Sequence, residues 1–190
     1  MSVEPDKPLA GRRVLLCVTG GIACYKSADL ASKLVRAGAE VDVAMTAAAE
    51  EFLRPLTFQA LTRRRVFDSL WQQAEDYRSQ HLSLTDAADL MIVAPATANF
   101  LAKMACGLAD DLVSTLALSA QGACAILLAP AMNSRMWAAP ATQANVRTIL
   151  SWGVHTIGPE TGRLACDTTG PGRMAEPADI LAEAIAIFRE

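Results

Sequence analysis

The sequence predicts a three-layer α/β fold in which helices cover both faces of a central parallel sheet. Short apolar runs of strand length alternate with amphipathic helical patterns along the chain, and this alternation is typical of right-handed βαβ crossovers. The apolar runs contain few polar residues, as expected for strands buried on both faces. With 190 residues, of which 52% are hydrophobic, the chain can bury the core of one domain spanning 1–190.

The first strand–helix–strand unit is clearly bounded. Arg13–Val18 is an apolar run of strand length, and Ala23–Arg36 follows it with apolar residues at helical spacing. Gly38 ends this helix, and Glu40–Met45 is the second expected strand. Residues 1–10 are polar and proline-containing, and we expect them to form a flexible tail.

Further along, a helical pattern covers Ala47–Leu61, and Thr62–Ser83 reads as a long irregular connection with a partial strand near Val66. Asp89–Ala94 is the third buried strand. The remaining expected elements are the helices Ala98–Cys106, Asp110–Ser119, Pro140–Leu150 and Pro177–Arg189 and the strands Ala123–Ala129 and Val154–Gly158. Residues 159–177 are rich in Gly, Thr and Pro and without periodicity, and a loop of this length in a compact domain is usually functional or disordered.

Composition excludes several classes of protein. The net charge is −3 and the one basic run is Arg63–Arg65, which reads as a solvated helix end, so a nucleic-acid partner is not expected. The N-terminus lacks the basic and apolar regions of a signal peptide, and the apolar run Leu90–Ala96 is too short to span a membrane. We therefore expect a cytoplasmic protein. Five cysteines without CxxC spacing predict neither a zinc site nor a disulfide framework.

Ligands of open parallel sheets bind at the carboxyl ends of the strands. After the first strand, Gly20 and Gly21 allow a close approach to an anion at a helix N-terminus, although an ordinary tight turn explains them equally well. The sequence matches neither GxGxxG nor GxxxxGK[ST], which disfavours dinucleotide and Walker-type sites. After the second strand, Thr46 is suited to cap a helix or to reach a phosphate.

Two later segments also follow strands. Pro95–Phe100 combines small residues with two polar side chains, a composition that suits a flat ring hydrogen-bonded at its edge. Asn133, after the fourth strand, taken alone is best explained as a helix cap. His81 taken alone is more often structural than catalytic. Cys166 lies in the polar loop and is the better candidate for a reactive thiol, whereas the other cysteines fall in or beside predicted elements.

Four motifs occur in order: GGIAxYK, PATAN, PAMNxxMW and GxLACxxxGxGRM. Together they resemble the homo-oligomeric flavin-containing cysteine decarboxylases, and in particular the phosphopantothenoylcysteine decarboxylase branch. The resemblance extends over about residues 11–187, and PAMNSRMW and GRLACDTTGPGRM are its most specific parts. It implies a Rossmann-like, flavodoxin-like fold that binds FMN, and a homotrimer or a dodecamer of trimers with active sites at subunit contacts. The apolar composition is consistent with such an oligomer.

The resemblance also implies roles for individual residues. His81 would be the active-site histidine, Asn133 would bind the substrate carboxylate, and Cys166 would donate a proton from a loop, 159–177, that closes over the substrate. On the cofactor, the phosphate side would be held by Gly20, Gly21, Ile22 and Thr46, and the flavin by Thr97, Ala98, Asn99 and Ala131. The substrate would be contacted by Asn133, Met136, Ala165, Arg173 and Met174.

The implied reaction converts 4′-phosphopantothenoylcysteine to 4′-phosphopantetheine in coenzyme A biosynthesis. Loss of CO₂ from a cysteine carboxylate leaves a carbanion without an electron sink, and oxidation of the thiolate through FMN would create one. FMN would be regenerated when the product is reduced, so the net reaction needs no external oxidant.

The sequence departs from the family pattern in two respects, and two other functions stay open. Many bacterial relatives carry a fused ligase domain, whereas this sequence ends at Glu190, which indicates a stand-alone decarboxylase or a piece of a longer protein. Asp167 follows the loop cysteine where bacterial relatives often have glycine. The alternatives are a peptidyl-cysteine decarboxylase of peptide-antibiotic maturation and a non-catalytic flavin-binding regulatory subunit. A flavin prenyltransferase would have no use for the PAMN and loop-cysteine motifs.

Overall fold

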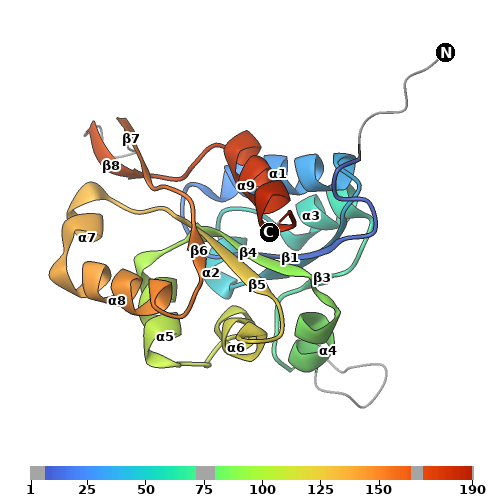
Figure 1. Ribbon diagram of the computed structural model, residues 1–190, viewed down its shortest axis with the longest axis horizontal. Helices are drawn as coiled ribbons and strands as arrows, with labels where there is room; N and C mark the ends of the chain where they lie inside the picture. The colour runs from blue at the N-terminus through green and yellow to red at the C-terminus, as the bar shows by residue number, and fades with distance from the viewer. Residues whose placement is uncertain (1–6, 72–79, 164–168, 190) are drawn as a thin grey trace.

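A six-stranded parallel sheet forms the centre of the molecule (Figure 1). The computed structural model describes residues 7–71, 80–163 and 169–189. The strands pair in the order β3-β2-β1-β4-β5-β6. They are β1 (Arg13–Val18), β2 (Glu40–Met45), β3 (Val66–Phe67), β4 (Leu90–Ala96), β5 (Ala125–Pro130) and β6 (His155–Thr156).

The strand order confirms the expected fold class. With β3 included, it is the 3-2-1-4-5-6 order of doubly wound Rossmann folds, and without this two-residue strand it becomes the 2-1-3-4-5 order of flavodoxin-like folds. In both descriptions the order reverses between β1 and β4, which pair in parallel from Val14 opposite Leu90 to Cys17 opposite Val93. The carboxyl ends of β1 and β4 therefore form the topological switch point, where such sheets bind ligands.

Helices cover both faces of the sheet, in agreement with the expected three layers (Figure 1). Alternate strand residues divide between two apolar cores, with Leu16 facing one layer of helices and Leu15 the other. The first layer contains α1 (Cys24–Arg36), α3 (Pro55–Thr62) and α9 (Pro177–Ile187). The second layer contains α4 (Gln80–Ala87), α5 (Ala98–Cys106), α6 (Leu112–Ala120) and α8 (Pro140–Leu150).

Three expectations about local structure were wrong. The helix expected over Ala47–Leu61 is two helices, α2 (Ala47–Glu50) and α3, because Pro55 disfavours a helical conformation at Arg54, which is extended. His81 was placed in an irregular segment but lies in the first turn of α4. The expected loop over 159–177 contains an antiparallel pair of strands, β7 (Glu160–Arg163) and β8 (Thr169–Arg173). In addition, a short helix, α7 (Ser134–Ala138), follows β5.

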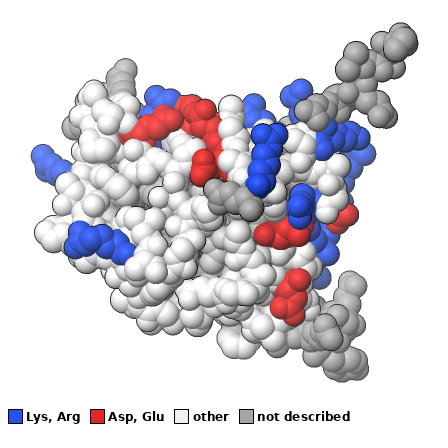
Figure 2. Space-filling view, viewed as in Figure 1, with Lys and Arg blue, Asp and Glu red and all other residues white. Residues whose placement is uncertain are grey.

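On the face seen in Figure 2, much of the surface carries no charge. In the view of Figure 2, acidic and basic side chains leave a broad uncharged area over α5 and α6. Large apolar side chains are exposed at several places, among them Leu118 on α6, Trp152 after α8, and Ile22 and Tyr25 near the start of α1. Within the described ranges, no helix combines the length and the apolar character needed to cross a membrane.

Candidate active site

A cavity of about 1250 Å³ lies at the carboxyl ends of β1, β2, β4 and β5. Each of these strands is followed by a segment that contributes to the cavity wall: residues 19–23 after β1, 46–48 after β2, 97–100 after β4 and 131–133 after β5. The end of β8 closes a further side through Gly172, Arg173 and Met174. Segments far apart in the sequence thus meet at the switch point of the sheet.

The turn after β1 has room only for glycine at position 20. A Cβ atom at Gly20 would lie 2.5 Å from the Cβ atom of Ala48 and 2.6 Å from its backbone carbonyl, so the turn packs directly on α2. Gly21 is less constrained, because a Cβ atom there would make an ordinary contact of 3.8 Å with Thr97. The N-terminus of α1 follows, and its first backbone N–H groups and dipole favour an anion.

Thr19 joins the ends of β1 and β4 and was not singled out from the sequence. Its buried hydroxyl donates a hydrogen bond to the carbonyl oxygen of Pro95 (2.6 Å) and accepts one from the backbone N–H of Thr97 (3.3 Å). Ser27 on α1 makes a similar link, donating to the carbonyl oxygen of Ala94 (2.6 Å). These hydrogen bonds join the end of β1 and the start of α1 to the end of β4. They do so without placing large apolar side chains in the cavity.

Two threonines expected to contact a cofactor also cap helices. The hydroxyl oxygen of Thr46 accepts a hydrogen bond from the N–H of Ala49 (3.2 Å) at the start of α2. That of Thr97 accepts from Phe100 (3.3 Å) at the start of α5. Both residues line the cavity. The capping alternative is therefore confirmed for Thr46, and the start of α5 directs a second helix N-terminus towards the cavity.

Asn133 lies where β5 gives way to α7. Its side-chain oxygen accepts a hydrogen bond from the backbone N–H of Arg135 (2.8 Å), so the helix-cap role is confirmed. The residue also lines the cavity. The preceding residue, Met132, donates its N–H to the carbonyl oxygen of Gly172 (2.9 Å). The β7–β8 hairpin is thus hydrogen-bonded to the segment that carries Asn133.

A group of ion pairs connects α1 to the base of the hairpin. The buried ammonium of Lys26 donates to the carbonyl oxygen of Met174 and to the Glu176 carboxylate, both at 2.9 Å. Arg173 pairs with the same carboxylate and, at 3.8 Å, with Glu160. Lys26 and then Arg173 lower the pKa of Glu176, and the pairing with Glu176 is the main cause of the raised pKa of Arg173.

A second ion-pair group lies on α5 and at the start of α6. The Lys103 ammonium is 2.7 Å from both Asp110 and Asp111, and these hydrogen bonds raise its pKa. Asp111 also caps α6 by accepting from the N–H of Ser114 (2.8 Å). Lys103 and Asp111 line the cavity, yet nothing in the sequence pattern had marked them as site residues.

Most site residues expected from the sequence do meet at this cavity. Among the described residues that line it are Gly20, Gly21, Ile22, Thr46, Thr97, Ala98, Asn99, Ala131, Asn133, Met136, Arg173 and Met174. His81 is not one of them, because α4 packs against α6 and β1 beside the sheet. Ala165 and Cys166 lie outside the described residues.

Three of the four cysteines that the structure describes are poor candidates for a nucleophile. Burial raises the pKa of the Cys17, Cys24 and Cys124 thiols, which therefore stay protonated at neutral pH. Cys17 lies inside β1. The thiol of Cys24 donates a hydrogen bond to the carbonyl oxygen of Thr19 (3.1 Å). Cys106 is exposed at the end of α5. The cysteine with an expected catalytic role is the one in the loop.

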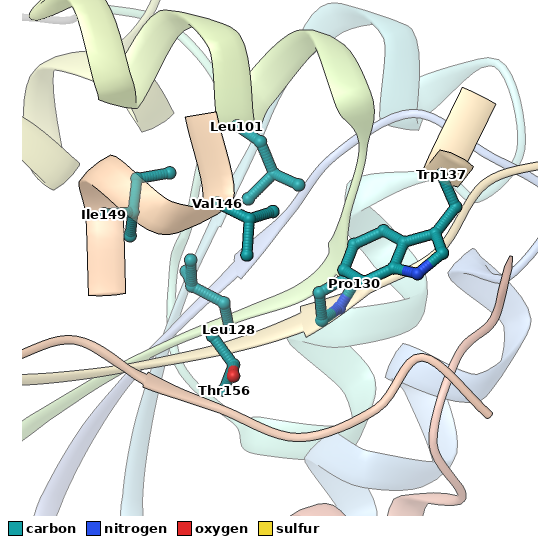
Figure 3. A pocket seen from close by; sticks show the side chains of 7 residues that line it. All are labelled: Leu101, Leu128, Pro130, Trp137, Val146, Ile149 and Thr156. Carbon is teal, nitrogen blue, oxygen red and sulfur yellow. The ribbon is translucent and has the colours of Figure 1, made fainter. Parts of the chain in front are cut away.

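A much smaller cavity lies between β5, α5 and α8 (Figure 3). Its volume is about 10 Å³, barely enough for one water molecule, and its wall is almost wholly apolar. Trp137 of the PAMNSRMW motif contributes to this wall together with Pro130. The tryptophan therefore anchors α7 to the core, which holds the neighbouring Asn133 at the larger cavity.

The larger cavity has the features that a flavin mononucleotide requires. The turn at Gly20 and Gly21, which brings no side chain to the cavity, and the N-terminus of α1 suit a phosphate group. Small residues after β4 and β5, such as Ala98 and Ala131, leave space for a flat ring. The volume of about 1250 Å³ exceeds what one drug-sized ligand usually fills, so a second molecule can be accommodated beside the first.

Comparison with known proteins agrees with this geometry. Residues 2–189 match the family model Flavoprotein. The chain is 47% identical over 180 residues to the coenzyme A biosynthesis bifunctional protein CoaBC of Vibrio cholerae serotype O1, covering 95% of this chain and 45% of that protein. The chain thus spans less than half the length of this relative.

Two solved structures are similar over almost the whole chain. A Cys-to-Ser mutant of PPC decarboxylase complexed with pantothenoylaminoethenethiol has 30% sequence identity and a TM-score of 0.83, covering 94% of this chain and 99% of that one. The FMN-dependent cysteine decarboxylase SpaF has 29% identity and a TM-score of 0.82, covering 96% and 99%.

Proposed function

The chain belongs to the Flavoprotein family, and from this premise we propose that it is an FMN-dependent decarboxylase of 4′-phosphopantothenoylcysteine that forms 4′-phosphopantetheine. The observation that carries the proposal is the convergence of the glycine turn, the PATAN segment and Asn133 on one cavity. Similarity to PPC decarboxylase over nearly its entire length supports the substrate, as does similarity to CoaBC proteins. A cytoplasmic location is part of this proposal.

The cofactor would be held by residues that follow four strands, β1, β2, β4 and β5. Gly20, Gly21 and Ile22 would bind its phosphate through backbone N–H groups, with Thr46 beside them. Thr97, Ala98, Asn99 and Ala131 would contact the ring. When bound, FMN would supply a two-electron acceptor for the cysteine thiolate and return those electrons to the product.

Asn133 would orient the carboxylate that leaves as CO₂. Because its side-chain oxygen accepts from Arg135, its amide NH₂ group is the donor that it can offer a carboxylate. Fixing the carboxylate aligns the bond that breaks. Met136, Ala165, Arg173 and Met174 would contact the rest of the substrate, and the β7–β8 hairpin would be the base of the closing loop.

Cys166 would protonate the product after CO₂ has left. The Cys-to-Ser mutant of PPC decarboxylase was captured with an enethiol compound, as expected if the cysteine of that protein acts late. His81 would assist removal of a proton early in the reaction. Since His81 does not line the cavity of its own chain, we propose that it serves the cavity of a neighbouring subunit.

We propose that the active assembly is a homotrimer or a dodecamer of trimers. Exposed apolar side chains at the cavity rim support this, since Ile22 and Tyr25 are each 62% exposed. The uncharged surface over α5 and α6 also suits a subunit contact (Figure 2). Light scattering is expected to give a multiple of three subunits, and a fully active monomer would refute the assembly.

A second candidate function is decarboxylation of a C-terminal peptidyl cysteine, favoured by similarity to SpaF. The two functions are separated by comparing CO₂ release from 4′-phosphopantothenoylcysteine with release from a peptide that ends in cysteine. We expect the small substrate to be preferred. Preference for the peptide would reassign the substrate, and bound flavin without CO₂ release from either compound would favour a regulatory flavin-binding subunit.

A further inference from the structure

Among the described residues of the cavity wall, Arg173 is the cation that a ligand can recruit at low cost. Among the described residues that line it, Lys26, Lys103 and Arg173 carry a positive charge. Lys103 is held by two carboxylates at 2.7 Å. The Lys26 side chain is only 8% exposed, and moving it would leave the Met174 carbonyl oxygen and Glu176 without this donor. The Arg173 side chain, by contrast, is 41% exposed.

The partners of Arg173 can also release it. Glu160 lies 3.8 Å from the guanidinium, beyond hydrogen-bonding distance, and its side chain is 35% exposed. Glu176 also pairs with the Lys26 ammonium at 2.9 Å, so it would keep this partner if Arg173 turned away. Exposed ion pairs of this kind contribute little to stability. In Figure 2, acidic side chains with basic ones beside them gather between the hairpin and α9, on a surface open to solvent.

We propose that Arg173 exchanges these carboxylates for a phosphate monoester, and that this phosphate is the one at the far end of the substrate from the cysteine. The inference rests on the proposed function. A guanidinium presents paired N–H donors that match phosphate oxygens, and a phosphate dianion competes well against two solvated carboxylates. Arg173 would therefore determine specificity for the phosphorylated substrate.

Two molecules proposed to enter the cavity carry a phosphate monoester: FMN and the substrate. The glycine turn and the N-terminus of α1 already offer backbone donors to one phosphate. Asn133 and Arg173 belong to segments joined by the Met132–Gly172 hydrogen bond, but their side chains are held by different partners, α7 in one case and Glu176 in the other. In the proposal, Asn133 therefore serves the carboxylate end of the substrate and Arg173 its phosphate end.

The test compares 4′-phosphopantothenoylcysteine with pantothenoylcysteine, which lacks the phosphate, in the full-length, FMN-loaded protein. Arg173→Gln is expected to lower kcat/KM for the phosphorylated substrate about 10-fold to 100-fold. It should change kcat/KM for pantothenoylcysteine less than about threefold. Arg147→Gln, at an exposed position of α8 away from the cavity, is the matched control and should change neither value.

A binding measurement without turnover separates recognition from structure. Calorimetric titration of 4′-phosphopantetheine and pantetheine should show that Arg173→Gln removes the preference for the phosphorylated compound. Glu160→Gln removes a competing carboxylate and should tighten binding of 4′-phosphopantetheine about twofold. If Arg173 only supported the hairpin, Glu160→Gln would weaken binding instead.

Other outcomes overturn the inference. An equal fall in kcat/KM for both substrates in Arg173→Gln would show that Arg173 maintains the hairpin and does not bind the substrate phosphate. Loss of FMN with retention of riboflavin, measured by absorbance after gel filtration, would assign Arg173 to the phosphate of the cofactor. If the wild-type protein decarboxylates neither compound, the proposed function itself fails, which is distinct from a failure seen only in the variant.

Discussion

Gly172 and Met132 are in direct backbone contact: the Met132 N–H donates to the Gly172 carbonyl oxygen at 2.9 Å, and a Cβ atom at Gly172 would overlap the Met132 carbonyl oxygen. Gly172 also has a φ of +143°, a conformation that side chains rarely adopt. The hairpin and the Asn133 segment are therefore positioned by a contact that only glycine permits.

Gly172→Ala is expected to separate the hairpin from the Asn133 segment. We expect kcat/KM to fall about 100-fold, because small displacements of positioning groups have effects of this size. FMN content should be nearly unchanged, since Gly172 is distant from the β1 turn in sequence and belongs to another segment of the wall. Gly122→Ala is the control, because Gly122 has a φ of +80° but open space around it. Similar kinetics of the two variants would show that the contact is unimportant.

Gly20→Ala is expected to reduce flavin binding. The added methyl group would push the β1 turn away from Ala48, and overpacking of this kind costs about 1–3 kcal/mol, or roughly 10-fold in FMN affinity. Equilibrium titration of the apoprotein with FMN, followed by flavin fluorescence, measures this change. Gly107→Ala, with positive φ and no atom within 4 Å, controls for backbone strain. Undiminished affinity in Gly20→Ala would place the cofactor phosphate elsewhere.

The two roles of Asn133 can be separated by a pair of variants. Asn133→Asp keeps an oxygen that caps α7, so the thermal midpoint should match that of the wild type, yet its charge should repel the substrate carboxylate and lower CO₂ release about 100-fold or more. Asn133→Ala should lose activity and, in addition, about 1 kcal/mol of stability through the missing cap. Normal CO₂ release by Asn133→Asp would limit Asn133 to its structural role.

Cys166→Ser should divide the reaction into its two halves. Serine is a much weaker acid than cysteine, so the last protonation should stall while CO₂ is still released. Mass spectrometry should then detect an enethiol in place of 4′-phosphopantetheine. Normal product at the wild-type rate would remove Cys166 from the mechanism, and complete loss of CO₂ release would mean that it acts earlier.

Acidification should weaken the link between α1 and the hairpin. Lys26 and Arg173 lower the pKa of Glu176 below its usual 4.5, so the stabilisation is present above that pH and is lost as the pH falls through the folded-state pKa. With a side chain 40% exposed, its contribution after screening is about 1 kcal/mol or less. Urea unfolding should show Glu176→Gln less stable than the wild type at neutral pH and equally stable at strongly acid pH. A pH-independent difference would contradict the ion-pair account.

The sequence predicts those elements of the fold that have a clear local pattern of apolar residues. Strands β1 and β2 and helix α8 have the predicted bounds, because apolar runs and a proline or glycine delimit them. Helix α4 was missed because its sequence, QHLSLTDA, has no clear apolar face. The β7–β8 pair was missed because ETGR and TGPGR have no alternation, and their pairing follows from tertiary contacts instead.

The site residues were predictable where a motif follows a strand. They were not predictable where two side chains far apart in the sequence form an ion pair. The segments after β1, β4 and β5 were recognised because all parallel strands end at one edge of the sheet. Lys26 and Glu176, which form an ion pair, lie 150 positions apart in the chain, and no local sequence pattern predicts their contact. Cys166 remains a prediction, since it lies outside the described residues.

Anaerobic turnover of 4′-phosphopantothenoylcysteine, analysed by mass spectrometry, tests the central claim most directly. The account predicts a product lighter than the substrate by one CO₂, formed in many turnovers per bound FMN without oxygen, because the electrons removed from the thiolate return to the product. Absence of any decarboxylated product would contradict the account. A product that lacks two further hydrogen atoms and accumulates only once per flavin until oxygen is admitted would contradict it as well.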